Sequence, residues 1–263
     1  MTYTQALVLG VVQGVTEFLP VSSSGHLILV PRVFGWPDQG LAFDAAMHLG
    51  TLGALLAYFR VELLELATGA LARRLAALLI AASVPALAVG WLINKWAEAH
   101  LRSATIIATT TALWALVMWW ADRRAVGSRG GGSDPLERVS WGQGLTVGFA
   151  QVLALIPGTS RSGVTISAGL FARLDRATAA RFSFMLGIPV TGAAGAYKLL
   201  HLLRAGVPAG ETGPLAFAIV VAFVSGWIAV WFLVNYLKRR SLMPFVVYRL
   251  LLAAAIFVVI LRG

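Results

Sequence analysis

The chain has 263 residues, of which 59% are hydrophobic and only 12% are charged, and its net charge is +10. A soluble domain carries about twice that share of charged residues, so the composition excludes an ordinary soluble protein. The sequence contains no cysteine, which excludes a disulfide framework and a thiolate metal site. Because the basic residues cluster in short loops between apolar runs, we interpret them as topology signals facing membrane lipids, and we expect no nucleic-acid partner.

The first apolar stretch covers about residues 3–35 and is interrupted near its middle by "LPVSSSGH". It starts without a basic segment or a small-residue cleavage site, so we expect no removable signal peptide. Lipid offers no partner to unpaired backbone groups, so a broken helix is stable at membrane depth only inside protein or beside a wet cavity. We therefore predict a re-entrant helical hairpin, which enters and leaves the membrane on one side.

A second interrupted stretch, about residues 140–171, contains "IPGTSRSG" and predicts a second re-entrant hairpin. The other apolar runs are long enough to cross the hydrocarbon core as helices. We predict six such spans, at about residues 43–60, 74–94, 103–121, 180–203, 215–237 and 243–261. The fold class is therefore an all-α polytopic membrane protein, in which a Gly/Ser-rich cytoplasmic linker at 122–139 separates the halves 1–121 and 140–263.

The two halves resemble each other, which predicts an inverted-topology repeat. "GVVQGVTEFLPVSSSG" at 10–25 matches "GFAQVLALIPGTSRSG" at 148–163, and "HLGTLGALLAY" at 48–58 echoes "MLGIPVTGAAGAY" at 185–197. Each half would hold one re-entrant hairpin and three transmembrane helices, and an odd number of spans inverts the second copy. The basic loops then fall on one side, which is cytoplasmic by the positive-inside rule, so we expect both termini outside.

The first hairpin carries polar side chains that indicate a site. Gln13 and Glu17 lie one turn apart on the same helical face, and an ionisable group at membrane depth usually marks a site, although an interfacial carboxylate is the alternative. The returning segment begins with Ser22, Ser23, Ser24, Gly25 and His26. Helix capping would explain one of these hydroxyls. Three of them, followed by glycine and histidine, look more like an anion cradle with an acid or base beside it.

The second hairpin supplies positive charge. Arg161 presents a planar fork that matches phosphate oxygens bidentately. Around it lie Gly158, Thr159, Ser160, Ser162, Gly163 and Thr165. An arginine in a purely structural loop would instead bond carbonyl groups of the break. A Ser/Arg/Gly turn opposing a Glu/Ser/His turn nevertheless predicts a phosphate site.

Three further polar residues are weaker candidates. Asp44 and His48 share a helical face near the outer end of their span, and we interpret them as interfacial rather than as the rim of a site. Arg249 lies too deep in the last span for easy snorkelling, so we expect it to meet an anion, either substrate or a glutamate.

These residues resemble a known family. Gln13 and Glu17 with "PVSSSGH" at 20–26, and "PGTSRSGVT" at 157–165, resemble the two signature regions of the bacterial undecaprenyl-pyrophosphate phosphatases of the bacitracin-resistance type. The likeness covers nearly the whole chain, including the late "PFVVYR". The family pattern allows Glu or Gln at position 13, so the carboxylate chemistry would rest on Glu17 alone.

The resemblance implies a multi-pass enzyme of the bacterial cytoplasmic membrane whose active site faces the periplasm. It would convert the C55 isoprenoid pyrophosphate to the monophosphate and recycle this carrier for cell-wall synthesis. Glu17, with Gln13, would hold Mg²⁺ or Ca²⁺, because hard cations prefer oxygen ligands. Arg161 and Ser160 would hold the terminal phosphate. Ser22, Ser24, Gly25, Ser162 and Thr165 complete the expected phosphate cradle.

The sequence leaves the nucleophile open. Ser23 is the choice we favour, with His26 as base or acid, but a phosphohistidine at His26 is the rival, since both lie on one helical face. Two other functions also stay open: a transporter or flippase of a polyprenyl phosphate lipid, because paired hairpins occur in transporters, and an anion channel, to which a carboxylate at the neck is unsuited. A homodimer is a further possibility that the sequence does not decide.

Overall fold

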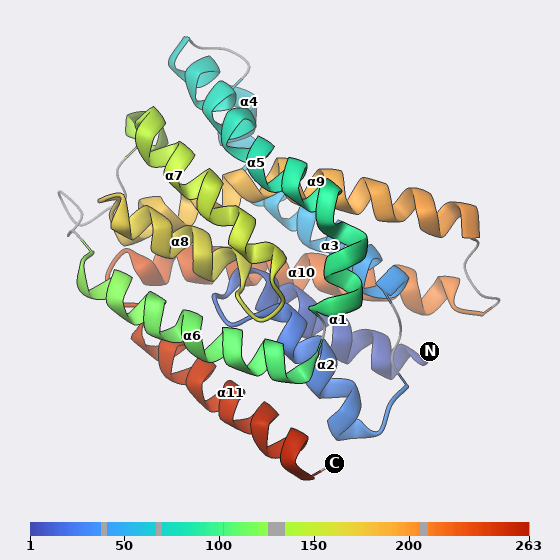
Figure 1. Cartoon of the computed structure of the whole chain (residues 1–263). Helices are drawn as coiled ribbons and strands as arrows, with labels where there is room; N and C mark the ends of the chain where they lie inside the picture. The colour runs from blue at the N-terminus through green and yellow to red at the C-terminus, as the bar shows by residue number, and fades with distance from the viewer. Residues whose placement is uncertain (38–40, 67–69, 102, 126–134, 206–209, 263) are drawn as a thin grey trace.

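The structure is a computed structural model that describes residues 1–37, 41–66, 70–101, 103–125, 135–205 and 210–262. The described chain is helical and forms no sheet (Figure 1). Its α-helices are α1 (Tyr3–Phe18), α2 (Ser23–Phe34), α3 (Leu41–Tyr58), α4 (Arg60–Glu65), α5 (Ala70–His100), α6 (Ala104–Arg123), α7 (Trp141–Gln151), α8 (Arg161–Phe171), α9 (Arg176–Ala205), α10 (Thr212–Leu237) and α11 (Met243–Arg262). Two 3₁₀ turns, η1 (Leu136–Arg138) and η2 (Val152–Leu155), complete the order.

Four helical segments of the described chain are long and apolar enough to cross a membrane. They are Arg73–Ile93, Ala104–Arg123, Thr212–Leu237 and Met243–Leu261. The prediction of an all-α polytopic membrane protein is therefore confirmed. These segments overlap four of the expected spans. The other two, 43–60 and 180–203, are covered by α3 and α9, but they do not qualify on the described residues and stay predictions.

Two pairs of short helices, α1 with α2 and α7 with α8, occupy the interrupted stretches. Each pair begins with the same capping box, in which Thr2 and Gln5, or Ser140 and Gln143, satisfy each other's backbone N–H groups. Figure 1 shows that the two pairs extend from opposite ends of the molecule and that their tips lie together near its middle. This arrangement agrees with opposed hairpins. Their re-entrant position in lipid and the inverted repeat stay predictions.

The two halves interleave, because the first helix of each hairpin packs against a long helix of the other half. Helix α1 packs chiefly against α10, and α7 packs chiefly against α5. Small residues make both approaches close: a Cβ at Gly10 would lie 2.8 Å from the Ala218 carbonyl oxygen, and one at Gly148 would overlap the Ala82 carbonyl. Helices α6 and α11 pack against each other along one side. The hairpins are thus fixed from outside by long helices.

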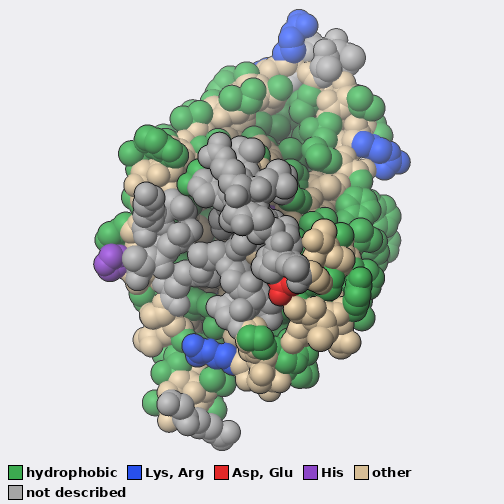
Figure 2. All heavy atoms as spheres, turned by 90° about the vertical axis from the view of Figure 1, so that its right-hand side faces the viewer, with side chains coloured by type: hydrophobic (Ala, Val, Ile, Leu, Met, Phe, Trp, Pro, Cys, Tyr) green, Lys and Arg blue, Asp and Glu red, His purple; other side chains and the backbone are tan. Residues whose placement is uncertain are grey.

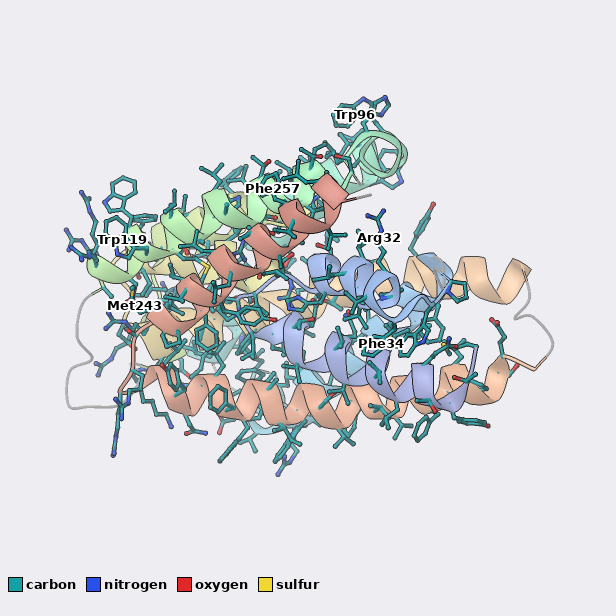
Figure 3. The ribbon with its side chains drawn as sticks, turned by 90° about the horizontal axis from the view of Figure 1, so that it is seen from below. Arg32, Phe34, Trp96, Trp119, Met243 and Phe257 are labelled. Carbon is teal, nitrogen blue, oxygen red and sulfur yellow. The ribbon has the colours of Figure 1, made fainter. Side chains whose placement is uncertain are left out.

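The outer surface is apolar, and the interior combines an apolar core with a set of buried polar side chains, whereas a soluble protein keeps most polar side chains outside. Trp91 and Leu92 on α5 are 80% and 71% exposed, whereas Gln13 and Arg249 are fully buried. Figure 2 shows hydrophobic side chains over the flanks of the bundle. Figure 3 shows nitrogen-bearing side chains gathered at the end marked by Trp119 and Met243.

Candidate active site

The tips of the two hairpins are joined by hydrogen bonds in both directions. The Gly158 N–H donates to Ser24 Oγ over 3.2 Å, and Ser162 Oγ donates to the Leu19 carbonyl over 3.2 Å. Thr110 of α6 adds a bond of 2.6 Å to the Pro157 carbonyl. The two broken segments therefore form one unit, and side chains 144 residues apart in the sequence come into contact there.

Glu17 lies at the centre of this unit and is 9% exposed. Its Oε2 accepts hydrogen bonds from Ser23 Oγ at 3.1 Å and from Gln13 Nε2 at 3.3 Å. Its Oε1 accepts from Arg161 Nη2 at 3.2 Å, which makes a buried ion pair between α1 and α8. Four of the residues expected in a site, from both hairpins, are thus brought together around one carboxylate.

His48 belongs to the same cluster, although its sequence position suggested an interfacial residue. Its Nε2 lies 3.6 Å from Glu17 Oε2, because α3 packs beside α1. One sequence signal could have found it: the repeated segments match at Leu and Gly, but His48 corresponds to Met185 in the second copy. A polar residue in only one copy of a repeat indicates a task that only that copy performs. The side chain of Asp44 lies outside the described residues.

Arg161 keeps unused donors beside Glu17. Its side chain is 12% exposed, and its Nε and Nη1 are buried without a hydrogen-bond partner among the described residues. An unpaired guanidinium N–H group in a buried position is costly unless an acceptor arrives. Each of these two nitrogens can donate a hydrogen bond to an oxygen of an anion. Arg161 is therefore prepared for an anion.

The two helices that start at the tips begin in the same unusual conformation. Ser22 and Ser160 precede α2 and α8 with φ of 75° and 69°, a left-handed region that non-glycine residues seldom adopt. Each also shares a hydrogen bond of 3.2 Å with the serine two residues later. Ser160 Oγ caps its helix by accepting from Gly163 N, but Ser22 makes no such cap bond. The first N–H groups of α2 are thus left without a side-chain cap.

His26 is held apart from this carboxylate cluster. Its Nδ1 lies 2.7 Å from the Ser22 carbonyl oxygen, and its Nε2 lies 2.6 Å from the Tyr248 hydroxyl of α11. No hydrogen bond joins it to Ser23 or Glu17 in the described structure. Sequence reasoning placed Ser23 and His26 on one face but missed Tyr248, since nothing local in "FVVYR" signals that partner.

The remaining hydroxyls expected in the phosphate cradle serve the scaffold in this structure. Thr165 Oγ1 donates to the Arg161 carbonyl at 2.7 Å and hydrogen-bonds with Ser183 of α9. Ser24 and Ser162 make the tip-to-tip bonds described above. Gly25 is buried at the start of α2, next to them. These residues fix the positions of the neighbouring groups around Glu17.

Arg249 meets backbone carbonyls rather than a glutamate among the described residues, and a contact with substrate stays a prediction. It is fully buried and donates to Pro20 O at 3.3 Å, Gly158 O at 2.8 Å and Thr111 O at 3.2 Å. The break in each hairpin leaves carbonyl oxygens without helical partners, and these oxygens carry the negative ends of peptide dipoles. The guanidinium satisfies both breaks at once and clamps them to α6.

The donor set is compatible with a divalent cation. The described residues contain no cluster of three or more acidic, histidine or cysteine side chains, so an all-protein cage is not formed there. Gln13 Oε1, however, is buried without a partner beside Glu17, and an amide oxygen with a carboxylate suits a hard cation. Mg²⁺ commonly takes one or two carboxylates and completes its coordination with substrate phosphates.

Comparison with known proteins identifies the family. The family model described as "Bacitracin resistance protein BacA" matches residues 6–255. The chain belongs to this family. Similar proteins named "Undecaprenyl-diphosphatase" occur in Pelobacter propionicus, with 44% identity over 100% of this chain and 99% of the relative, and in Teredinibacter turnerae, with 42% identity over 99% and 100%. The relative in Hahella chejuensis has 42% identity over 98% of both chains.

Proposed function

We propose that the protein hydrolyses undecaprenyl diphosphate to undecaprenyl phosphate and inorganic phosphate. Membership of the BacA family and the names of full-length relatives support this enzyme activity. The structural observation that carries it is Arg161, which is buried with two free donors beside Glu17 and Ser23. Such donors are suited to phosphoryl oxygens whose charge grows during transfer. The activity would recycle the lipid carrier for cell-wall synthesis and confer resistance to bacitracin.

The pyrophosphate and the isoprenoid tail of the substrate would each have a suitable environment in the structure. The terminal phosphate would bind Arg161 and the uncapped N–H groups at the start of α2, where the helix dipole also favours an anion. Next to Gly25, a shallow apolar depression lies between α2, α6 and α11. Its lining includes Ile28, Leu29, Ile107 and Ile256, which suits the isoprenoid chain. The pyrophosphate would therefore sit at the tips while the tail stays in an apolar environment.

Ser23 is the nucleophile that the geometry favours. Its hydroxyl already donates to Glu17 Oε2, so the carboxylate can accept the proton when Ser23 Oγ attacks the terminal phosphorus. The bond from that phosphorus to the bridging oxygen breaks, and undecaprenyl phosphate leaves. Water then hydrolyses the phosphoserine to free phosphate. His26 is less suited to either role in this state, because both its ring nitrogens are engaged elsewhere.

The divalent cation remains part of the proposal. Glu17 and Gln13 Oε1 would hold it, and when bound it would neutralise charge on the pyrophosphate oxygens. Arg161 provides positive charge to the same carboxylate, and His48 Nε2 also lies against it. Arg161 and His48 orient Glu17, because Arg161 lies against its Oε1 and His48 lies against its Oε2.

The orientation follows from the distribution of charge. Basic residues lie at the end where α6 and α10 finish, including Arg123, Arg124, Lys238, Arg239 and Arg240. The positive-inside rule supports a cytoplasmic position for this end, and the termini and the mouth of the α1/α2 hairpin would then lie on the periplasmic side of the bacterial inner membrane. A cysteine replacing Arg240 should react with a membrane-impermeant maleimide only after the cells are opened. Labelling in intact cells would reverse the orientation.

One assay tests the proposed function and separates it from transport. Purified protein in detergent should release phosphate from C55 and C15 pyrophosphates when Mg²⁺ or Ca²⁺ is present, and Arg161→Ala should abolish the release. A flippase without hydrolytic activity would release none. Absence of release from the folded wild-type protein at any cation concentration would refute the proposal. A homodimer remains a separate question, which the mass of the detergent complex would answer.

A further inference from the structure

The imidazole of His26 is fixed by a bond at each nitrogen. The Ser22 carbonyl can only accept, so Nδ1 must carry the hydrogen of the 2.7 Å bond. In the neutral ring Nε2 then has a lone pair, and the Tyr248 O–H donates to it over 2.6 Å. The two rings are nearly parallel, with an interplanar angle of 3°. Histidine orientation is thus determined by a residue of α11.

The group that His26 holds is the carbonyl of a strained residue. Ser22 has a left-handed φ of 75°, and non-glycine residues keep such a conformation only where their surroundings enforce it. The equivalent Ser160 is held by its own cap bond to Gly163 N, and Val164 follows where the first tip has His26. Ser22 lacks the cap bond. The first tip therefore needs another restraint, and the histidine provides it.

We infer that Tyr248 is a positioning residue for phosphoryl transfer. Through His26 it holds the Ser22 turn, and so it orients Ser23 toward Glu17 while leaving the first N–H groups of α2 open to the substrate phosphate. A serine cap at Ser22 would have used one of those N–H groups. This inference rests on the proposed function. It gives His26 a role in holding the turn and not in attacking phosphorus.

The location of Tyr248 fits this role. Tyr248 is 44% exposed on α11, while its hydroxyl reaches the buried His26. The neighbouring Arg249 clamps the two breaks from the same turn of α11. Two consecutive residues of the last helix thus hold the tips. Tyr248 acts through its bond to the His26 side chain, and Arg249 acts through its bonds to backbone carbonyl groups.

The direct test is the tautomer of His26. The chain has four histidines, so ¹⁵N-labelled histidine gives few ring signals, and His26→Gln identifies the one that disappears. Wild-type protein without substrate should show His26 protonated at Nδ1 with a strongly hydrogen-bonded Nε2, and Tyr248→Phe should shift the Nε2 signal. An Nε2-protonated neutral ring, or an unchanged spectrum in Tyr248→Phe, would overturn the inference whatever the activity.

Kinetics supply the second test. Tyr248→Phe removes only the hydroxyl, so kcat for C15 pyrophosphate should fall by ~5- to 10-fold, as loss of one hydrogen bond allows, with KM nearly unchanged. In a His26→Gln background the same change should alter kcat less than twofold. Additive losses would show that Tyr248 acts independently of His26 and would refute the inference.

A matched control removes a tyrosine hydroxyl elsewhere. Tyr236, near the end of α10, packs its ring against Phe232 and Phe245 at centroid distances of 5.4 and 5.7 Å. Tyr236→Phe should leave kcat and the His26 spectrum unchanged. If wild-type protein released no phosphate, the proposed function would fail while the tautomer measurement would still test the turn. If wild type were active and Tyr248→Phe matched it in kcat, only the positioning role would fail.

Discussion

Replacing Arg161 by lysine separates the charge of this residue from its fork of donors. Arg161 Nη2 pairs with Glu17, and Nε and Nη1 remain free in a buried position. Lysine has a single nitrogen, which would stay with Glu17 and leave neither donor for the substrate phosphate. Loss of one preorganised donor costs ~10²- to 10³-fold in kcat. Because the two donors would act on the same phosphate and are not additive, we expect a loss of ~10²- to 10⁴-fold.

Folding should change little in the same variant. The ion pair with Glu17 is retained, so Arg161→Lys should lose no more than ~1 kcal/mol, or ~2–4 °C in melting temperature for a chain of this size. Phosphate release from C15 pyrophosphate and thermal unfolding in detergent measure the two effects. Arg176→Lys is the control, because Arg176 pairs with Asp122 at 2.6 Å between α6 and α9, away from the tips. Its turnover should match wild type. Wild-type turnover in Arg161→Lys would show that charge alone suffices and would refute the donor argument.

Four further variants test other contacts of the site. Glu17→Gln should lose most activity and its response to added Mg²⁺ or Ca²⁺, whereas Gln13→Glu should be tolerated; a metal-responsive Glu17→Gln enzyme would place the cation elsewhere. Ser23→Ala should be inactive at every pH, and the phosphoenzyme trapped in wild type should be stable to acid, as phosphoserine is; acid-labile label on His26 would make histidine the nucleophile. Arg249→Met removes three bonds to carbonyls and should lower stability by about 2–4 kcal/mol after allowance for the buried charge it removes, and an unchanged melting temperature would contradict the clamp.

Local chemistry allowed the breaks in the hairpins to be predicted. Pro20 and Pro157 lack the N–H group that a continuing helix needs, and the hydroxyl clusters after them are typical of helix starts. The structure ends α1 and restarts α2 and α8 in these segments. Opposed polar turns also indicated that Glu17 and Arg161 share a site, and the 3.2 Å ion pair agrees with that expectation.

Contacts between distant segments were harder to predict. Three residues, His48, Tyr248 and Arg249, reach the tips only because α3 and α11 pack beside the hairpins. The sequence around each of them is apolar, and such a sequence would look the same if the residue did not reach the site. Arg249 was expected to seek an anion, since a buried charge usually needs one. The sequence does not reveal that a broken backbone can supply several carbonyl oxygens at one point.

The position of the arginine clamp on α11 determines when the protein can become active during its synthesis. The residue that satisfies the break at Pro20 lies 229 positions later in the chain, and Tyr248 beside it restrains His26. Until the last helix has been made and inserted, both breaks hold buried carbonyl groups without this partner, and the Ser22 turn lacks its support. Truncation before α11 therefore removes more than a lipid-facing helix: a chain that ends early keeps Glu17, Ser23 and Arg161 but not the groups that hold them in place.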